Sequence, residues 1–116
     1  MSVVIYHNPK CSKSRETLAL LENKGIQPQV IKYLETEITP SLLKTLYSQL
    51  GVHSVRDMMR TKESIYKELD LARESLSDDD LFQAMIEHPK LIERPIVVAN
   101  GKARHGRPPE QVLDIL

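Results

Sequence analysis

The order of apolar segments in the first third of the chain constrains the fold more than any other feature. Residues 3–7 are β-branched and aromatic, which is typical of a short buried strand. After an Asn-Pro break, residues 12–24 have helical apolar spacing, and Gly25 is suited to end that helix. Residues 29–34 indicate a second strand. This order predicts a βαβ unit with parallel strands and a right-handed crossover.

The middle of the chain is helical in character. A Thr-Pro pair at 39–40 combines an N-cap with a proline suited to the first helical position, and the apolar stripe ends at Gly51. Residues 54–60 and 62–69 indicate two short helices, and another is expected over 77–88. These segments predict a helical insert between two halves of a sheet.

The end of the chain returns to strands. Residues 96–99 and 102–105 flank an Asn-Gly pair, which is a strong signal for a two-residue hairpin. Residues 106–109 lead into a last helix. The complete order is β-α-β, helices, then β-β-α, which predicts an α/β fold with a mixed four-stranded sheet and a helical subdomain inserted at about 39–89.

Length and composition limit the class of protein. A chain of 116 residues predicts one domain spanning 1–116. Lys plus Arg and Asp plus Glu each number 16, so no general attraction to nucleic acid or to an anionic membrane is expected. No apolar run approaches the roughly 18 residues of a membrane helix, and no signal-peptide pattern is seen. We therefore expect a soluble, cytoplasmic protein with no nucleic-acid or membrane partner.

The only cysteine, Cys11, is the first candidate for chemistry. It lies at the predicted N-terminus of the first helix, where free N–H groups and the helix dipole favour the nucleophilic thiolate. Lys10, Lys13 and Arg15 add positive potential, and His7 leaves the first strand at the same edge. The alternative is an inert buried cysteine, but such a residue has apolar neighbours. The polar stretch N-P-K-C-S-K-S favours a chemical role.

Ser14 takes the place of the second cysteine in a C-x-x-C redox motif. With one thiol, the chain forms no internal disulfide and needs an outside thiol to complete a redox cycle. Two interpretations of Ser14 are open. Its hydroxyl donates a hydrogen bond to the Cys11 sulfur, or it is a plain cap of the first helical turn.

Arginines gather at the other end of the chain. Arg94 precedes Pro95 at the start of the third strand, and Arg104 and Arg107 lie near the end of the hairpin. In an open α/β sheet, the edge that carries the Cys11 loop is where ligands bind. Arginine suits bidentate recognition of a tetrahedral oxyanion, while ordinary surface solvation is the alternative for each arginine.

No metal site is expected. The acidic run at 78–80 falls in the first turn of a predicted helix, where carboxylates complement the dipole, so we interpret it as structural. Metal-ligand spacing is not found among the histidines, which are His7, His53, His88 and His105.

Four motifs resemble the glutaredoxin-dependent arsenate reductase (ArsC-like) family. H-N-P-x-C-x-x-S-R-x-T-L stands at 7–18, D-x-x-R at 57–60, R-P-I-V at 94–97 and G-R-P-P-E at 106–110. A single C-x-x-S is a weak signal, but four motifs in order over nearly the whole chain are a strong one.

The resemblance implies a thioredoxin-like three-layer fold and a cis peptide bond before Pro95. It also implies that Cys11 is the nucleophile, that His7 helps to keep it ionised, and that no cofactor is bound. The residues that it assigns to the oxyanion are Arg60, Arg94 and Arg107.

The activity implied is arsenate reduction with glutathione as co-substrate and glutaredoxin as partner. One departure concerns the segment after the nucleophile, where well-known members often have C-G-T-S and this chain has C-S-K-S. Glycine lets the backbone approach an anion closely. Ser12 adds a Cβ there, and Lys13 adds a charge.

Two alternatives belong to other classes. The first is a monothiol oxidoreductase acting on glutathionylated proteins, or a reductase of another oxyanion. The second is a redox-responsive regulator that binds RNA polymerase, as a sister family with this fold does. That family usually carries C-x-x-C, and Ser14 removes such a disulfide switch.

Overall fold

The computed structural model describes residues 2–116, which form two units. The sheet unit contains the chain up to Glu37 together with Arg94–Leu116, and the helical unit is Ile38–Glu93. The helical insert expected at about 39–89 falls within the helical unit, and a single domain over 1–116 stays a prediction. In the part of the chain that the structure describes, no helix is long and apolar enough to cross a membrane.

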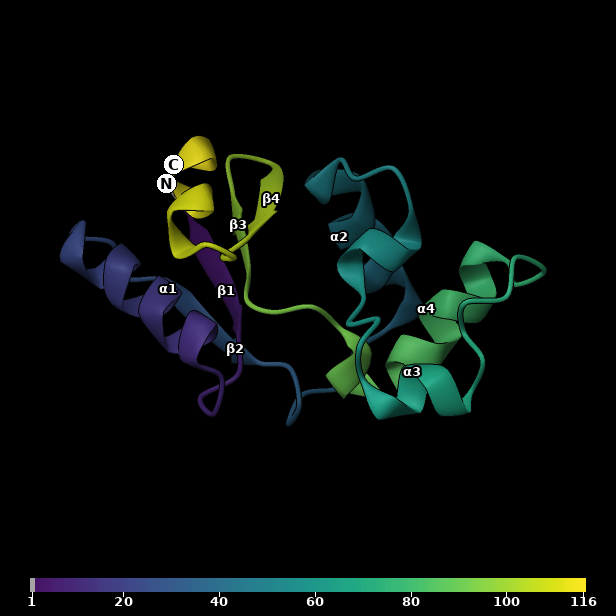
Figure 1. Cartoon of the computed structure of the whole chain (residues 1–116). Coiled ribbons are helices and arrows are strands. Elements are labelled where there is room, and N and C mark those ends of the chain that lie inside the picture. Colours follow the sequence, from purple (N-terminus) through teal and green to yellow (C-terminus); the bar gives the residue numbers. More distant parts are fainter. Residues whose placement is uncertain (1) are drawn as a thin grey trace. The chain divides into compact units, whose positions relative to one another are not determined.

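The sheet unit contains β1 (Val3–His7), α1 (Ser12–Asn23), β2 (Gln29–Lys32), β3 (Ile96–Ala99), β4 (Lys102–His105) and the 3-10 segment η3 (Pro109–Ile115), as seen in Figure 1. The strand order is β2-β1-β3-β4. β1 pairs in parallel with β2, while the β1–β3 and β3–β4 pairs are antiparallel. The parallel βαβ pairing, the hairpin and the mixed four-stranded sheet are thereby confirmed.

The core of this unit lies between the sheet, α1 and η3. Ile5 of β1 is paired with Val97 of β3, and both are fully buried together with Leu21 of α1 and Val112 of η3. Alternate strand residues point to one face of a sheet, and each such side chain contributes about 1.5–3 kcal/mol when buried. This packing holds the N-terminus of α1 near the carboxyl end of β1, where Cys11 lies.

The helical unit contains α2 (Pro40–Leu50), the 3-10 segment η1 (Val55–Met58), α3 (Ser64–Glu68), α4 (Asp78–Glu87) and the 3-10 segment η2 (Pro89–Leu91). Thr39 caps α2 by accepting the Leu42 N–H at 3.1 Å, as expected for the Thr-Pro pair. Ser77 and Asp80 form a reciprocal capping box at the start of α4. The acidic run is therefore placed in the first helical turn, as predicted.

Three elements differ from their predictions. β2 ends at Lys32, because a turn follows in which the Glu35 N–H donates to the Lys32 carbonyl at 2.9 Å. The helix expected over 54–60 is the short 3-10 segment η1. The last helix is also 3-10: Pro109, Val112 and Ile115 are buried there, and their spacing of three matches the three residues per turn of that helix.

Candidate active site

The loop between β1 and α1 places the thiol. Cys11 is the N-cap of α1, with extended backbone angles (φ −97°, ψ 124°). Its N–H donates to the Asn8 carbonyl, and the Lys10 N–H donates to Asn8 Oδ1, both at 3.0 Å. Arg15 Nη1 donates to the Pro9 carbonyl at 3.0 Å. These bonds fix a tight turn that holds the half-buried Cys11 at the helix start.

Ser14 connects the first turn of α1 to the end of β1. It is fully buried, its Oγ lies 2.6 Å from His7 Nδ1, and it accepts the Asn8 N–H at 3.0 Å. The hydrogen bonds given for this hydroxyl are therefore to His7 and Asn8. These partners differ from both interpretations of Ser14, since neither the Cys11 sulfur nor an N–H of the first turn of α1 is among them, and the hydroxyl instead braces the loop between β1 and α1. A catalytic role of Ser14 stays a prediction.

His7 is a buried, neutral partner of Ser14. Burial lowers the pKa of His7, and the charges of Lys32 and Arg15 lower that pKa further. A neutral imidazole can accept a hydrogen bond from the Ser14 hydroxyl at Nδ1. In this geometry His7 acts on the Cys11 turn through Ser14, without a positive charge of its own, and its assistance to the thiolate stays a prediction.

The Cys11 thiol is shifted toward the thiolate. Burial alone raises the pKa of Cys11, but the Ser14 N–H, a hydrogen bond and charge from Arg94, and the Lys13 N–H together lower that pKa below its usual value. The free N–H groups of the first turn therefore favour the ionised form, as expected at a helix N-terminus.

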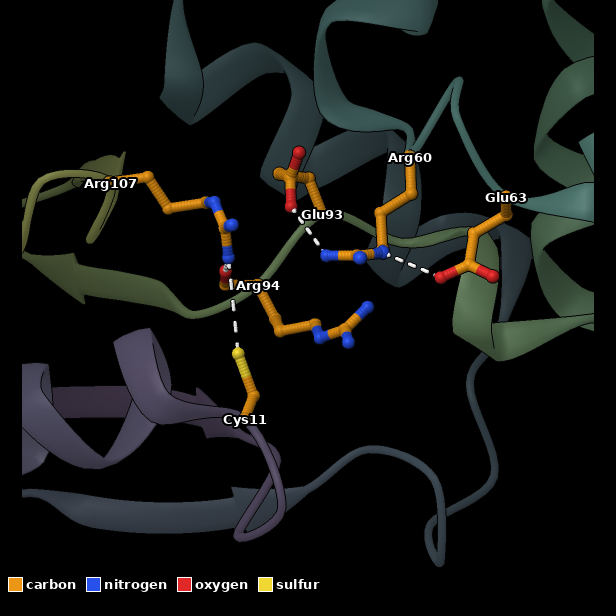
Figure 2. Close-up of polar contacts among 6 residues, drawn as sticks. All are labelled: Cys11, Arg60, Glu63, Glu93, Arg94 and Arg107. Carbon is orange, nitrogen blue, oxygen red and sulfur yellow. Dashed lines mark hydrogen bonds and ion pairs between the residues drawn. The ribbon is translucent and has the colours of Figure 1, made fainter.

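Two arginines converge on the sulfur from separate loops of the sheet unit. Arg107 Nη1 lies 3.9 Å from Cys11 Sγ and also donates to the Arg94 carbonyl at 3.1 Å, as Figure 2 shows for the contact with sulfur. The peptide bond before Pro95 is cis, as the resemblance implied, and so is the bond before Pro108, which was not predicted. The site can therefore present a thiolate and two guanidinium groups to one anion.

The residues that depart from the usual motif lie on the outer side of the helix start. Ser12 is exposed, and Lys13 Nζ pairs with Glu16 Oε2 at 3.4 Å. Lys13 acts on the Cys11 pKa through its backbone N–H, and its ammonium group is engaged with Glu16.

Arg60 belongs to the helical unit, where two carboxylates bind it. Its Nε lies 2.9 Å from Glu63 Oε1, and its Nη1 lies 3.2 Å from Glu93 Oε1 (Figure 2). The sequence analysis missed both glutamates; the spacing of three residues between Arg60 and Glu63 was a signal for the first. Asp57 of the same motif caps η1 by accepting the Ser54 N–H at 3.1 Å. The oxyanion role of Arg60 stays a prediction.

The fold and the single activated thiol define a thioredoxin-like protein of the one-cysteine type. The model of the ArsC family matches residues 6–115, so the chain belongs to the ArsC family.

Several known proteins are similar over the full length. The uncharacterized protein YfgD of Escherichia coli K12 is 61% identical over 98% of this chain and 96% of its own length. A Haemophilus influenzae protein called arsenate reductase is 58% identical over 100% of both chains. The solved structure of an arsenate reductase from Vibrio cholerae has a TM-score of 0.99 and 76% identity, covering 100% of this chain and 98% of that one.

Proposed function

We propose that this chain is a cytoplasmic arsenate reductase in which Cys11 is the nucleophile, with glutathione as co-substrate, glutaredoxin as partner and no bound cofactor. One observation carries the proposal: the Cys11 sulfur, favoured as thiolate, has Arg107 Nη1 at 3.9 Å and Arg94 as a hydrogen-bonding partner. The names of the full-length relatives support arsenate as the oxyanion.

The proposed reaction begins when the Cys11 thiolate attacks arsenic and one arsenate oxygen leaves as water. Glutathione then displaces a second arsenate oxygen as water, which leaves arsenic bonded to both the Cys11 sulfur and the glutathione sulfur. A glutaredoxin thiolate attacks the glutathione sulfur, so that glutathione and glutaredoxin are joined in a disulfide while the two electrons of the arsenic–sulfur bond stay on arsenic. Water finally cleaves the bond between Cys11 and the reduced arsenic, which releases arsenite and regenerates the Cys11 thiol. Arg94 and Arg107 would offset the anion charge during attack, since fixed positive groups aimed at developing charge lower the barrier.

The test measures NADPH consumption in a mixture of arsenate, glutathione, glutaredoxin and glutathione reductase. We expect Cys11→Ser to abolish turnover, and Arg94→Ala and Arg107→Ala each to lower kcat/KM by about ten- to a hundredfold. Arg73→Ala is the matched control, because Arg73 is exposed and pairs with Asp70. Arsenate turnover by the Cys11→Ser variant would contradict the proposal.

A second candidate is a monothiol oxidoreductase acting on glutathionylated proteins. It is favoured by the same lowered pKa of Cys11 together with the serine at position 14, because one activated thiol suffices to attack a mixed disulfide. Release of glutathione from a glutathionylated peptide, with no turnover of arsenate, would favour this candidate.

A further inference from the structure

A cavity of about 230 Å³ lies beside the Cys11 turn, at the carboxyl ends of β1 and β2. Its lining comes from residues 7–10 on one side and from Lys32, Leu34 and Glu35 on the other. Pro9 and Leu34, which is 47% exposed, give it apolar walls. All of these residues belong to the sheet unit, and Lys10 directly precedes Cys11 in the chain.

The rim of the cavity carries three charged side chains that form no ion pair among residues 2–116. They are Lys10, Lys32 and Glu35, and all three are exposed. The backbone around them is nevertheless fixed, because Asn8 Oδ1 accepts the Lys10 N–H and the Lys32 carbonyl accepts the Glu35 N–H. The charge of Lys32 also contributes to the lowered pKa of His7, so its positive field reaches the cavity wall.

We propose that this cavity binds glutathione, with the glutathione carboxylates facing Lys10 and Lys32 and its ammonium group facing Glu35. The inference rests on the proposed use of glutathione as co-substrate. At neutral pH the tripeptide has two carboxylates and one ammonium, which complement the two ammonium groups and one carboxylate of the rim.

The mixed charge distinguishes this ligand from a simple anion. A compact oxyanion would gain from the two lysines but would be repelled by Glu35, whereas a zwitterion satisfies all three groups. The volume is below the roughly 300 Å³ of the smallest usual ligand pockets, so the cavity accommodates the γ-glutamyl end, whose carboxylate and ammonium face Lys32 and Glu35. The remainder then extends past Lys10, which faces the glycine carboxylate, toward Cys11, and this would present the glutathione thiol to an adduct on the Cys11 sulfur.

The direct test uses S-methylglutathione, whose thiol is blocked, and measures its affinity by calorimetry. We expect Lys10→Gln and Lys32→Gln each to weaken binding about two- to fivefold, as for exposed ion pairs, and about tenfold together. Lys102→Gln is the matched control, because Lys102 is exposed on β4 and away from the cavity lining. Glu35→Gln should weaken the binding of S-methylglutathione. It should not change the affinity for the N-acetyl derivative, which lacks the ammonium.

A spectroscopic readout locates the ligand. A carboxylate bound at Lys32 would offset the positive charge that lowers the pKa of His7, so the NMR-monitored pKa of His7 should rise when S-methylglutathione is added. In the coupled assay, Lys10→Gln and Lys32→Gln should each raise the KM for glutathione.

The outcomes separate the two proposals. Lysine-dependent binding without arsenate turnover would support the site and defeat the reductase proposal. The binding site would be wrong, and the reductase proposal intact, if turnover were normal and substitutions at Lys10, Lys32 and Glu35 changed neither the affinity nor the KM for glutathione.

Discussion

At the sulfur of Cys11, burial and local polar groups act in opposite directions. Burial raises the pKa of the thiol, yet the Ser14 and Lys13 N–H groups and Arg94 more than offset it. The N–H groups are a property of any helix start, but the arginine comes from a distant loop. The helix start that lowers the Cys11 pKa could be predicted from the sequence, while the contribution of Arg94 depends on the fold. The role of Cys11 as nucleophile stays a prediction.

Replacing Ser14 by alanine tests the bracing role of its hydroxyl. The change removes the hydrogen-bonding partner of two buried groups, the Asn8 N–H and His7 Nδ1. We therefore expect the free energy of unfolding to fall by about 1–3 kcal/mol. The Cys11 pKa should stay low, because the Ser14 backbone N–H remains. Urea denaturation and thiolate absorbance measure the two effects.

Ser12→Ala is the control for this experiment, because Ser12 is exposed in the same helical turn. If Ser14→Ala raised the Cys11 pKa and left stability unchanged, the hydroxyl would act on the sulfur, and the bracing role would be wrong.

At the scale of elements, the close approach of Gly106 to Thr17 of α1 fixes the segment that carries Arg107. Gly106 follows β4, and its N–H donates to the Pro95 carbonyl at 3.0 Å. A Cβ on Gly106 would overlap Thr17 Oγ1 and would lie 2.8 Å from Pro95 Cγ, closer than such atoms can approach without movement. Glycine is therefore required for this packing, beside both the cis Pro95 and Arg107.

Gly106→Ala should destabilise the protein by about 1–3 kcal/mol, the usual effect of overpacking. It should also lower reductase activity, because the shift displaces Arg107 from Cys11. Denaturant unfolding of Gly106→Ala, Thr17→Ala and the double variant measures the effect. The double variant should lose less stability than the sum of the singles, since Thr17→Ala removes the obstructing hydroxyl; additive losses would contradict a steric cause.

Local patterns predicted most of the elements, and long-range contacts explain what they missed. The first βαβ unit and the Asn-Gly hairpin follow from apolar spacing and turn residues within a few positions. The partners of Arg60 could be anticipated only in part, since Glu93 is 33 residues away. The cis bond before Pro108 had no local signal beyond the proline itself.

At the scale of the molecule, the chain separates its candidate groups between two units. Cys11, Arg94 and Arg107 all belong to the sheet unit, so their geometry depends on one sheet and its loops. Arg60 belongs to the helical unit and is bound there by Glu63 and Glu93. The D-x-x-R motif identified Arg60 from the sequence, but its carboxylate partners depend on how the helical unit folds.

The pKa directions of two groups predict how stability depends on pH. The folded pKa of His7 lies below its ordinary 6.5, so its contribution is complete above 6.5 and is lost as pH falls from 6.5 through the folded value. The folded pKa of Cys11 lies below its ordinary 9.0, so its contribution is complete above 9.0 and is lost as pH falls from 9.0 through the folded value. Stability should therefore rise with pH up to 6.5 through His7 and up to 9.0 through Cys11.

Urea unfolding as a function of pH measures this dependence in the parent, Cys11→Ser and His7→Gln. Cys11→Ser should flatten the window below pH 9.0 and leave the window below pH 6.5, while His7→Gln should do the reverse. A parent curve that fell with rising pH toward 9.0, or a Cys11→Ser curve with an unchanged upper slope, would contradict the thiolate assignment. The upper window thus tests the charge on the Cys11 sulfur without any substrate, through the stability of the whole chain.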